Sequence, residues 1–158
     1  MCYCEKTVFC SILLIIAVLL NACGSVNSTK TNSSLSQIQS VVRESQKAFE
    51  NGDVSKANEK VSELIKISED SLYSESEKMI ASYCALYIQS GLMLDYIIKN
   101  DKKWLETHNV DEFQEFHSQM FIEVVNGRLT HIDTLREYGH ALYNSTREIE
   151  KHYKEIHK

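Results

Sequence analysis

The stretch CALYIQSGLMLDYII, residues 84–98, decides the fold. It is apolar on most sides of a helix, with Gln89 and Asp95 as its polar interruptions. It is also shorter than the roughly 20 apolar residues that cross a bilayer. A helix that is apolar nearly all round is buried among other helices. Ser74 and Glu77 fit a capping box, so we predict a central, buried helix over residues 75–99.

Two amphipathic helices are predicted on the N-terminal side of this stretch. From Leu35 onward, apolar residues recur every three or four positions, which is the period of a helix with one buried face. Asn51-Gly52 ends the first helix, because Gly readily adopts the left-handed conformation that closes helices. Asp53 is the predicted N-cap of the second. A turn this short predicts an antiparallel helical hairpin.

The same hairpin carries a weak likeness to a known repeat. Its small and hydrophobic positions are Ala48, Gly52, Asp53, Ala57 and Leu64. With these positions, residues 45–65 resemble one hairpin of a tetratricopeptide-like repeat, and no second copy follows at a period of 34 residues. The resemblance implies a tetratricopeptide-like adaptor as one alternative function.

A long helix is predicted at the C-terminal end of the chain. The polar stretch NDKKWLETHN, residues 100–109, precedes it, and Trp104 and Leu105 are expected to plug the end of the bundle. Further on, residues step alternately by three and four positions, the heptad spacing of a helix packed at a shallow angle. These residues are Ile132, Leu135, Gly139, Leu142, Thr146, Ile149, Tyr153 and Ile156. Asn126-Gly127 either breaks this segment or kinks it, and the tail after Ile149 is free to protrude.

Composition supports an all-α fold. The chain of 158 residues contains no Pro and five Gly, whereas strand-rich domains need many tight turns. We therefore predict a bundle of four to five amphipathic helices over residues 35–158, with a long C-terminal helix. The net charge is −5, from 17 basic and 22 acidic residues, without a large basic block. Nucleic-acid binding depends on neutralising phosphates, so no nucleic-acid partner is predicted.

The N-terminal segment predicts where in the cell the protein is located. Residues 8–20, VFCSILLIIAVLL, form a run too short to span a bilayer but suited to a signal peptide. The following residues, Leu20-Asn21-Ala22-Cys23, resemble the lipobox of bacterial lipoproteins. The resemblance implies that residues 1–22 are a signal peptide, cut by signal peptidase II before Cys23 once its sulfur carries a diacylglyceryl group. The alternatives are a secretory signal cut after Ala22, or an uncleaved anchor.

Lipidation of Cys23 would place the protein in a bacterial cell envelope, with the membrane as its first partner. Two or three acyl chains, such as palmitate, hold a protein stably where one chain does not. Gly24 follows in place of the Asp associated with inner-membrane retention, which favours the outer membrane in a Gram-negative cell. Residues 24–34, GSVNSTKTNSS, are predicted to be a flexible tether that reaches on the order of 35–40 Å when extended.

Few residues of the predicted bundle suggest chemistry. Glu137-x-x-His140 places two ligand-type side chains on one helix face, but di-iron bundles need a second such motif and two further glutamates. Tyr87 and Asp95 share a face of the central helix and are candidates, with Glu137 and His140, to line a binding groove. Gly91, between them, is expected to allow close helix packing. No catalytic residue, metal ligand or cofactor is predicted.

The predicted function follows from the address and the fold. We expect a lipid-anchored, non-enzymatic helical protein that binds another envelope protein. A small-molecule or metal-binding bundle, using Tyr, His and Glu side chains between helices, is the alternative.

Overall fold

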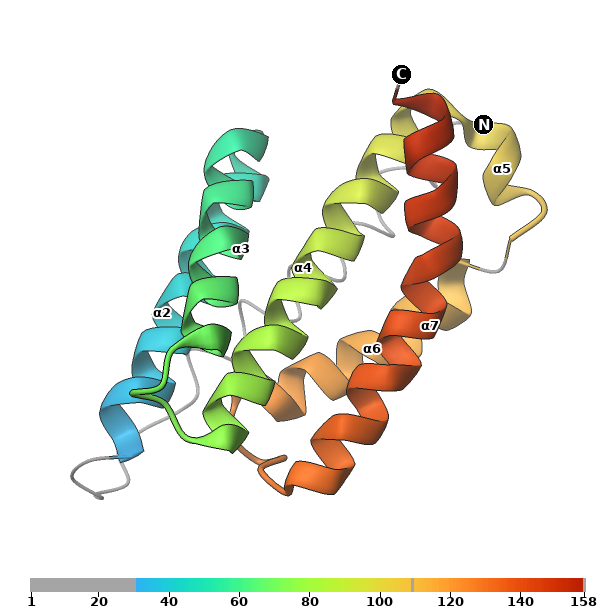
Figure 1. Cartoon of the computed structure of the whole chain (residues 1–158). Coiled ribbons are helices and arrows are strands. Elements are labelled where there is room, and N and C mark those ends of the chain that lie inside the picture. Colours follow the sequence, from blue (N-terminus) through green and yellow to red (C-terminus); the bar gives the residue numbers. More distant parts are fainter. Residues whose placement is uncertain (1–30, 109, 158) are drawn as a thin grey trace.

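The computed structural model describes residues 31–108 and 110–157, and these form six helices (Figure 1). The helices are α2 (Thr31–Glu50), α3 (Val54–Glu69), α4 (Glu75–Asn100), α5 (Lys102–Leu105), α6 (Val110–Val125) and α7 (Ile132–Ile156). The described ranges contain no strand, so the predicted all-α bundle with a long C-terminal helix is confirmed. The predictions for the signal peptide and for Cys23 fall outside these ranges.

Helix α4 is the centre of the bundle, as predicted. It packs against α3 on one side and α7 on the other, and it also contacts α6 and α2 (Figure 1). Its buried residues are Ile80, Ala81, Tyr83, Cys84, Ala85, Ser90, Met93, Leu94 and Ile97. The buried polar residues Ser90 and Thr146 satisfy each other in this core, because their hydroxyls lie 2.8 Å apart and form a hydrogen bond.

Helices α4 and α7 run in the same direction. Ser90 meets Thr146, and six residues further along α4 the ring of Tyr96 contacts that of Tyr153. Of the predicted heptad positions of α7, Leu135, Leu142, Thr146 and Ile149 are buried, whereas Ile132 at the start of the helix is 39% exposed. The parallel arrangement requires the chain to return to the start of α7 through α5 and α6.

Helices α2 and α3 form the predicted antiparallel hairpin. Gly52 adopts a φ of +76° after α2, and the Asp53 carboxylate accepts a hydrogen bond from the Lys56 N–H at 2.9 Å. Across the hairpin, Lys60 Nζ lies 2.8 Å from Glu44 Oε2. Local sequence signals therefore specify this unit, as predicted.

Helix α2 begins four residues earlier than predicted, at Thr31 instead of Leu35. The Ser34 hydroxyl donates a hydrogen bond to the Glu77 carboxylate in the first turn of α4. Glu77 completes the predicted capping box at the same time, because its carboxylate accepts from the Ser74 N–H at 2.8 Å. A tertiary partner thus supports a helical turn whose Asn and Ser residues favour turns on their own.

The break between α6 and α7 lies at Asn126-Gly127, where Gly127 has a φ of +67°. The Gln39 amide donates to the Val125 carbonyl at 2.7 Å, so α2 caps the end of α6.

The prediction for Gly91 in α4 is wrong, since a Cβ there would meet no atom within 4 Å. Close helix packing is therefore not the reason for that glycine.

A second, smaller core lies at the end of the bundle where α4 ends, next to α5 and the last part of α7. Its buried members are Met93, Leu94, Ile97 and Ile149. Trp104 and Leu105 pack against it, which confirms the predicted plug. Tyr153 and Ile156 pack there too, so the end of α7 lies on the core and does not protrude.

Candidate functional site

The four predicted groove residues have separate surroundings. Tyr87 stacks on Phe121 of α6, with ring centroids 4.3 Å apart, and burial raises the pKa of its hydroxyl. Asp95 Oδ2 accepts from Lys99 Nζ at 2.6 Å within α4. Glu137 and His140 are exposed on α7. Within residues 31–108 and 110–157 no hydrogen bond or ion pair joins any two of these four side chains, and no group of three His, Cys, Asp or Glu is placed to hold a metal.

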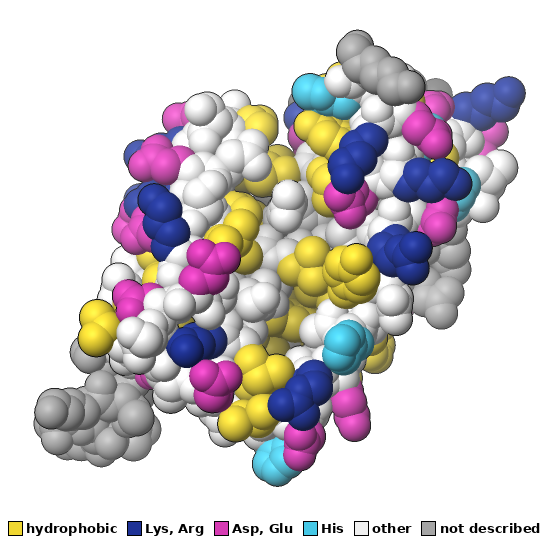
Figure 2. Space-filling view, in the orientation of Figure 1, with side chains coloured by type: hydrophobic (Ala, Val, Ile, Leu, Met, Phe, Trp, Pro, Cys, Tyr) yellow, Lys and Arg dark blue, Asp and Glu magenta, His cyan; other side chains and the backbone are white. Residues whose placement is uncertain are grey.

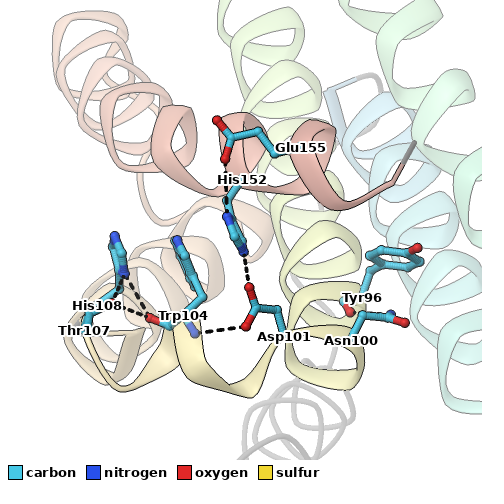
Figure 3. Close-up of polar contacts among 8 residues, drawn as sticks. All are labelled: Tyr96, Asn100, Asp101, Trp104, Thr107, His108, His152 and Glu155. Atoms are coloured by element: carbon cyan, nitrogen blue, oxygen red, sulfur yellow. Dashed lines mark hydrogen bonds and ion pairs between the residues drawn. The ribbon is translucent and has the colours of Figure 1, made fainter.

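A different group of side chains gathers where α4, α5 and α7 meet (Figure 3). Asp101 organises this corner. Its N–H closes α4 by donating to the Ile97 carbonyl at 2.7 Å, and its Oδ1 accepts from the Trp104 N–H at 3.3 Å to start α5. The chain turns sharply here, which places the Trp104 indole against α7.

Trp104 lies between two imidazole rings. The ring of His108 stacks on one face at a centroid distance of 4.1 Å, and that of His152 stacks on the other at 5.0 Å. The two imidazoles are tilted by only 12° and 10° from the indole plane. His108 Nδ1 also lies 2.9 Å from the Thr107 hydroxyl (Figure 3). The stack therefore ties the turn after α5 to the last part of α7.

Carboxylates face both nitrogens of His152. Nε2 lies 3.0 Å from Asp101 Oδ2, and Nδ1 lies 3.7 Å from Glu155 Oε2 (Figure 3). The His152 side chain is 14% exposed, and that of Asp101 is 33% exposed. Asp101 thus uses one oxygen to cap α5 and the other to hold α7.

Three more rings form a second set at the same end of α4 and α7. Tyr96 meets Tyr153 edge to face at 5.2 Å, and His157 packs against both rings, at 4.9 Å and 4.8 Å. We call this region the aromatic end of the bundle, and its six rings are those of Tyr96, Trp104, His108, His152, Tyr153 and His157. His108 and His157 are exposed, and the other four are partly buried.

A further histidine is buried beneath α7. His117 of α6 is 3% exposed, and its Nε2 lies 3.2 Å from the Ser145 hydroxyl. Burial lowers the pKa of this imidazole, because desolvation disfavours the charged form. Cys84 is fully buried, and burial raises the pKa of its thiol, which makes it a poor nucleophile.

Sequence reasoning found only part of the aromatic end. It placed Trp104 in the plug, but it did not join His152 to it. Asp101 directly before α5 is a recognisable capping signal, and Trp104 and His108 share a helical spacing of four. Nothing in the sequence marks the pairing of Asp101 with His152, which are 51 residues apart.

Comparisons of the chain with protein-family models, with curated proteins and with solved structures find no match. Among the described helices, none combines the length and the apolar character needed to cross a membrane.

Proposed function

We propose that the protein is a bacterial lipoprotein, anchored in the cell envelope through Cys23, whose helical domain binds another envelope protein without catalysing a reaction. The outer membrane is the proposed location in a Gram-negative cell. Support for the anchor comes from the Leu20-Asn21-Ala22-Cys23 lipobox and from the apolar run that precedes it.

The observation that supports protein binding is the aromatic end. Aromatic side chains are enriched in the centres of protein interfaces, while polar groups form the rim. Here two sets of Tyr, Trp and His rings lie at one end of the bundle, and Asp101 and Glu155 flank His152 in one of them. Asp101 and the stacked rings hold this region in one arrangement, so a partner would bind it at a small entropic cost. On the face in Figure 2, acidic and basic side chains are interspersed along the helices, and hydrophobic side chains gather in the hollow between them.

The anchor is tested by Cys23→Ser. We expect this variant to lose incorporation of labelled acyl chains and to leave the membrane fraction. Acyl labelling and membrane fractionation that survive the substitution would refute lipidation at Cys23.

Partner binding is tested with exposed histidines, which can be changed without disturbing the core. We expect His108→Ala with His157→Ala to reduce recovery of a cross-linked partner from solubilised envelopes roughly tenfold, the loss that corresponds to ~1.4 kcal/mol. The matched control changes two exposed histidines elsewhere, His131→Ala with His140→Ala, and should leave recovery unchanged. Equal recovery from both pairs would contradict the proposed role of the aromatic end.

A further inference from the structure

The described chain begins at one end of the bundle. The first turns of α2 lie beside the α3–α4 turn, because Ser34 bonds Glu77 and Gln37 Oε1 accepts from the Tyr73 hydroxyl at 2.8 Å. They also lie beside the α6–α7 turn, since Leu35 packs against Gly127. We call this the Thr31 end. The aromatic end lies at the opposite end of α4 and α7 (Figure 1).

The chain between Cys23 and Thr31 is shorter than the bundle. Eight residue steps extend at most about 26–29 Å, at 3.3–3.6 Å each. Helix α4, with 26 residues, is about 39 Å long at 1.5 Å per residue. If Cys23 is acylated and lies at the bilayer surface, Thr31 must lie within about 26–29 Å of that surface. The bundle therefore cannot place its aromatic end on the lipid with Thr31 at the far end.

The most exposed large hydrophobic side chain of the described residues lies at the Thr31 end. Leu72 is 89% exposed at the tip of the α3–α4 turn, whereas the next, Tyr143, is 53% exposed. The turn holds Leu72 in place, because its N–H donates to Asp70 Oδ1 at 2.9 Å and the Tyr73 N–H donates to the Asp70 carbonyl. A single exposed Leu is ordinary by itself. Leu72 is notable because it also lies beside the first turns of α2, where the predicted tether joins the bundle.

We propose that the Thr31 end faces the bilayer and that Leu72 enters the boundary between headgroups and acyl chains. This inference rests on the proposed lipidation of Cys23. Glu69 and Glu75 flank the turn, so an anionic bilayer would repel the turn of a protein that is not tethered to it. The tether overcomes this repulsion by holding the turn at a high effective concentration near the surface. The aromatic end then points away from the membrane, where an envelope partner can reach it.

The structure allows a site-specific test on the intact lipoprotein. Cys84 is fully buried and the sulfur of an acylated Cys23 is blocked, so an added surface cysteine is the accessible thiol of the mature chain. Leu72→Cys carries an environment-sensitive fluorophore after labelling. Val54→Cys is the matched control, because Val54 is an exposed apolar residue, 45% exposed, at the other end of α3. Both proteins are reconstituted into phosphatidylethanolamine–phosphatidylglycerol vesicles.

We expect the probe at position 72 to shift its emission to shorter wavelength and to become several-fold less accessible to an aqueous quencher. The probe at position 54 should keep the long-wavelength emission and the quencher accessibility of a probe exposed to water. Equal responses at the two positions, or a larger one at position 54, would overturn the proposed orientation. Intact mass measured on the same samples separates the two proposals. Absence of the acyl group overturns both, whereas an acylated protein with an unresponsive probe at position 72 overturns only the orientation.

Discussion

Substitution by alanine should stabilise the protein at two of the four glycines of the helical domain and destabilise it at the other two. Gly91 in α4 and Gly139 in α7 lie inside helices, and a Cβ at either would meet no atom within 4 Å. Glycine in a helix interior costs about 0.5–1 kcal/mol relative to alanine, because its unfolded chain is more flexible. We therefore expect Gly91→Ala and Gly139→Ala each to raise the free energy of unfolding by about 0.5–1 kcal/mol.

Gly52 and Gly127 provide the matched controls. Both have a positive φ, a conformation that costs other residues about 1–2 kcal/mol. Gly52 has open space around a Cβ, so Gly52→Ala should destabilise by about that amount alone. At Gly127 a Cβ would also come within 2.7 Å of Leu35 Cδ2, so Gly127→Ala should cost more than Gly52→Ala.

Urea titrations followed by circular dichroism measure the stability of all four variants in the Cys23→Ser background. The slope with urea should stay unchanged, so that each difference is a change in stability. The melting temperatures of Gly91→Ala and Gly139→Ala should rise by roughly 2–5 °C. A loss of stability in Gly91→Ala, or four variants that respond alike, would refute the assignment of these backbone positions.

Two further predictions concern the histidines. Burial lowers the pKa of His117 below its ordinary value of 6.5, so the unfolded chain binds the proton first and stability falls as the pH drops below about 6.5. The loss of stability between pH 7.5 and pH 5.5 should be smaller in His117→Gln, and an unchanged loss in urea titrations would contradict this. Asp101→Ala and His152→Ala should be coupled by about 0.5–1.5 kcal/mol in a double-mutant cycle, because each removes the same hydrogen bond. Strictly additive effects would show that the contact contributes nothing to stability.

The local structure of this protein could be predicted from its sequence. The caps at Asp53 and Ser74, the glycine turns at Gly52 and Gly127 and the heptad spacing of α7 all act within a few residues. Such signals predicted the type of the long helices and the central position of α4, but they left the number at four or five, because Asn126-Gly127 could break or kink the last segment. The likeness of Leu20-Asn21-Ala22-Cys23 to a lipobox is equally local, and the location that it predicts does not depend on the fold.

The aromatic end and the orientation of the bundle depend on contacts between distant parts of the chain. Asp101 meets His152 only because α7 runs parallel to α4, an arrangement that no local pattern encodes. Helix α2 extends to Thr31 because Ser34 finds Glu77, 43 residues away. Likewise, Leu72 lies beside the start of α2 through the packing of α2 against α3 and α4. Sequence periodicity specifies which face of each helix is buried, whereas only packing decides which faces meet and which residues share an end of the bundle.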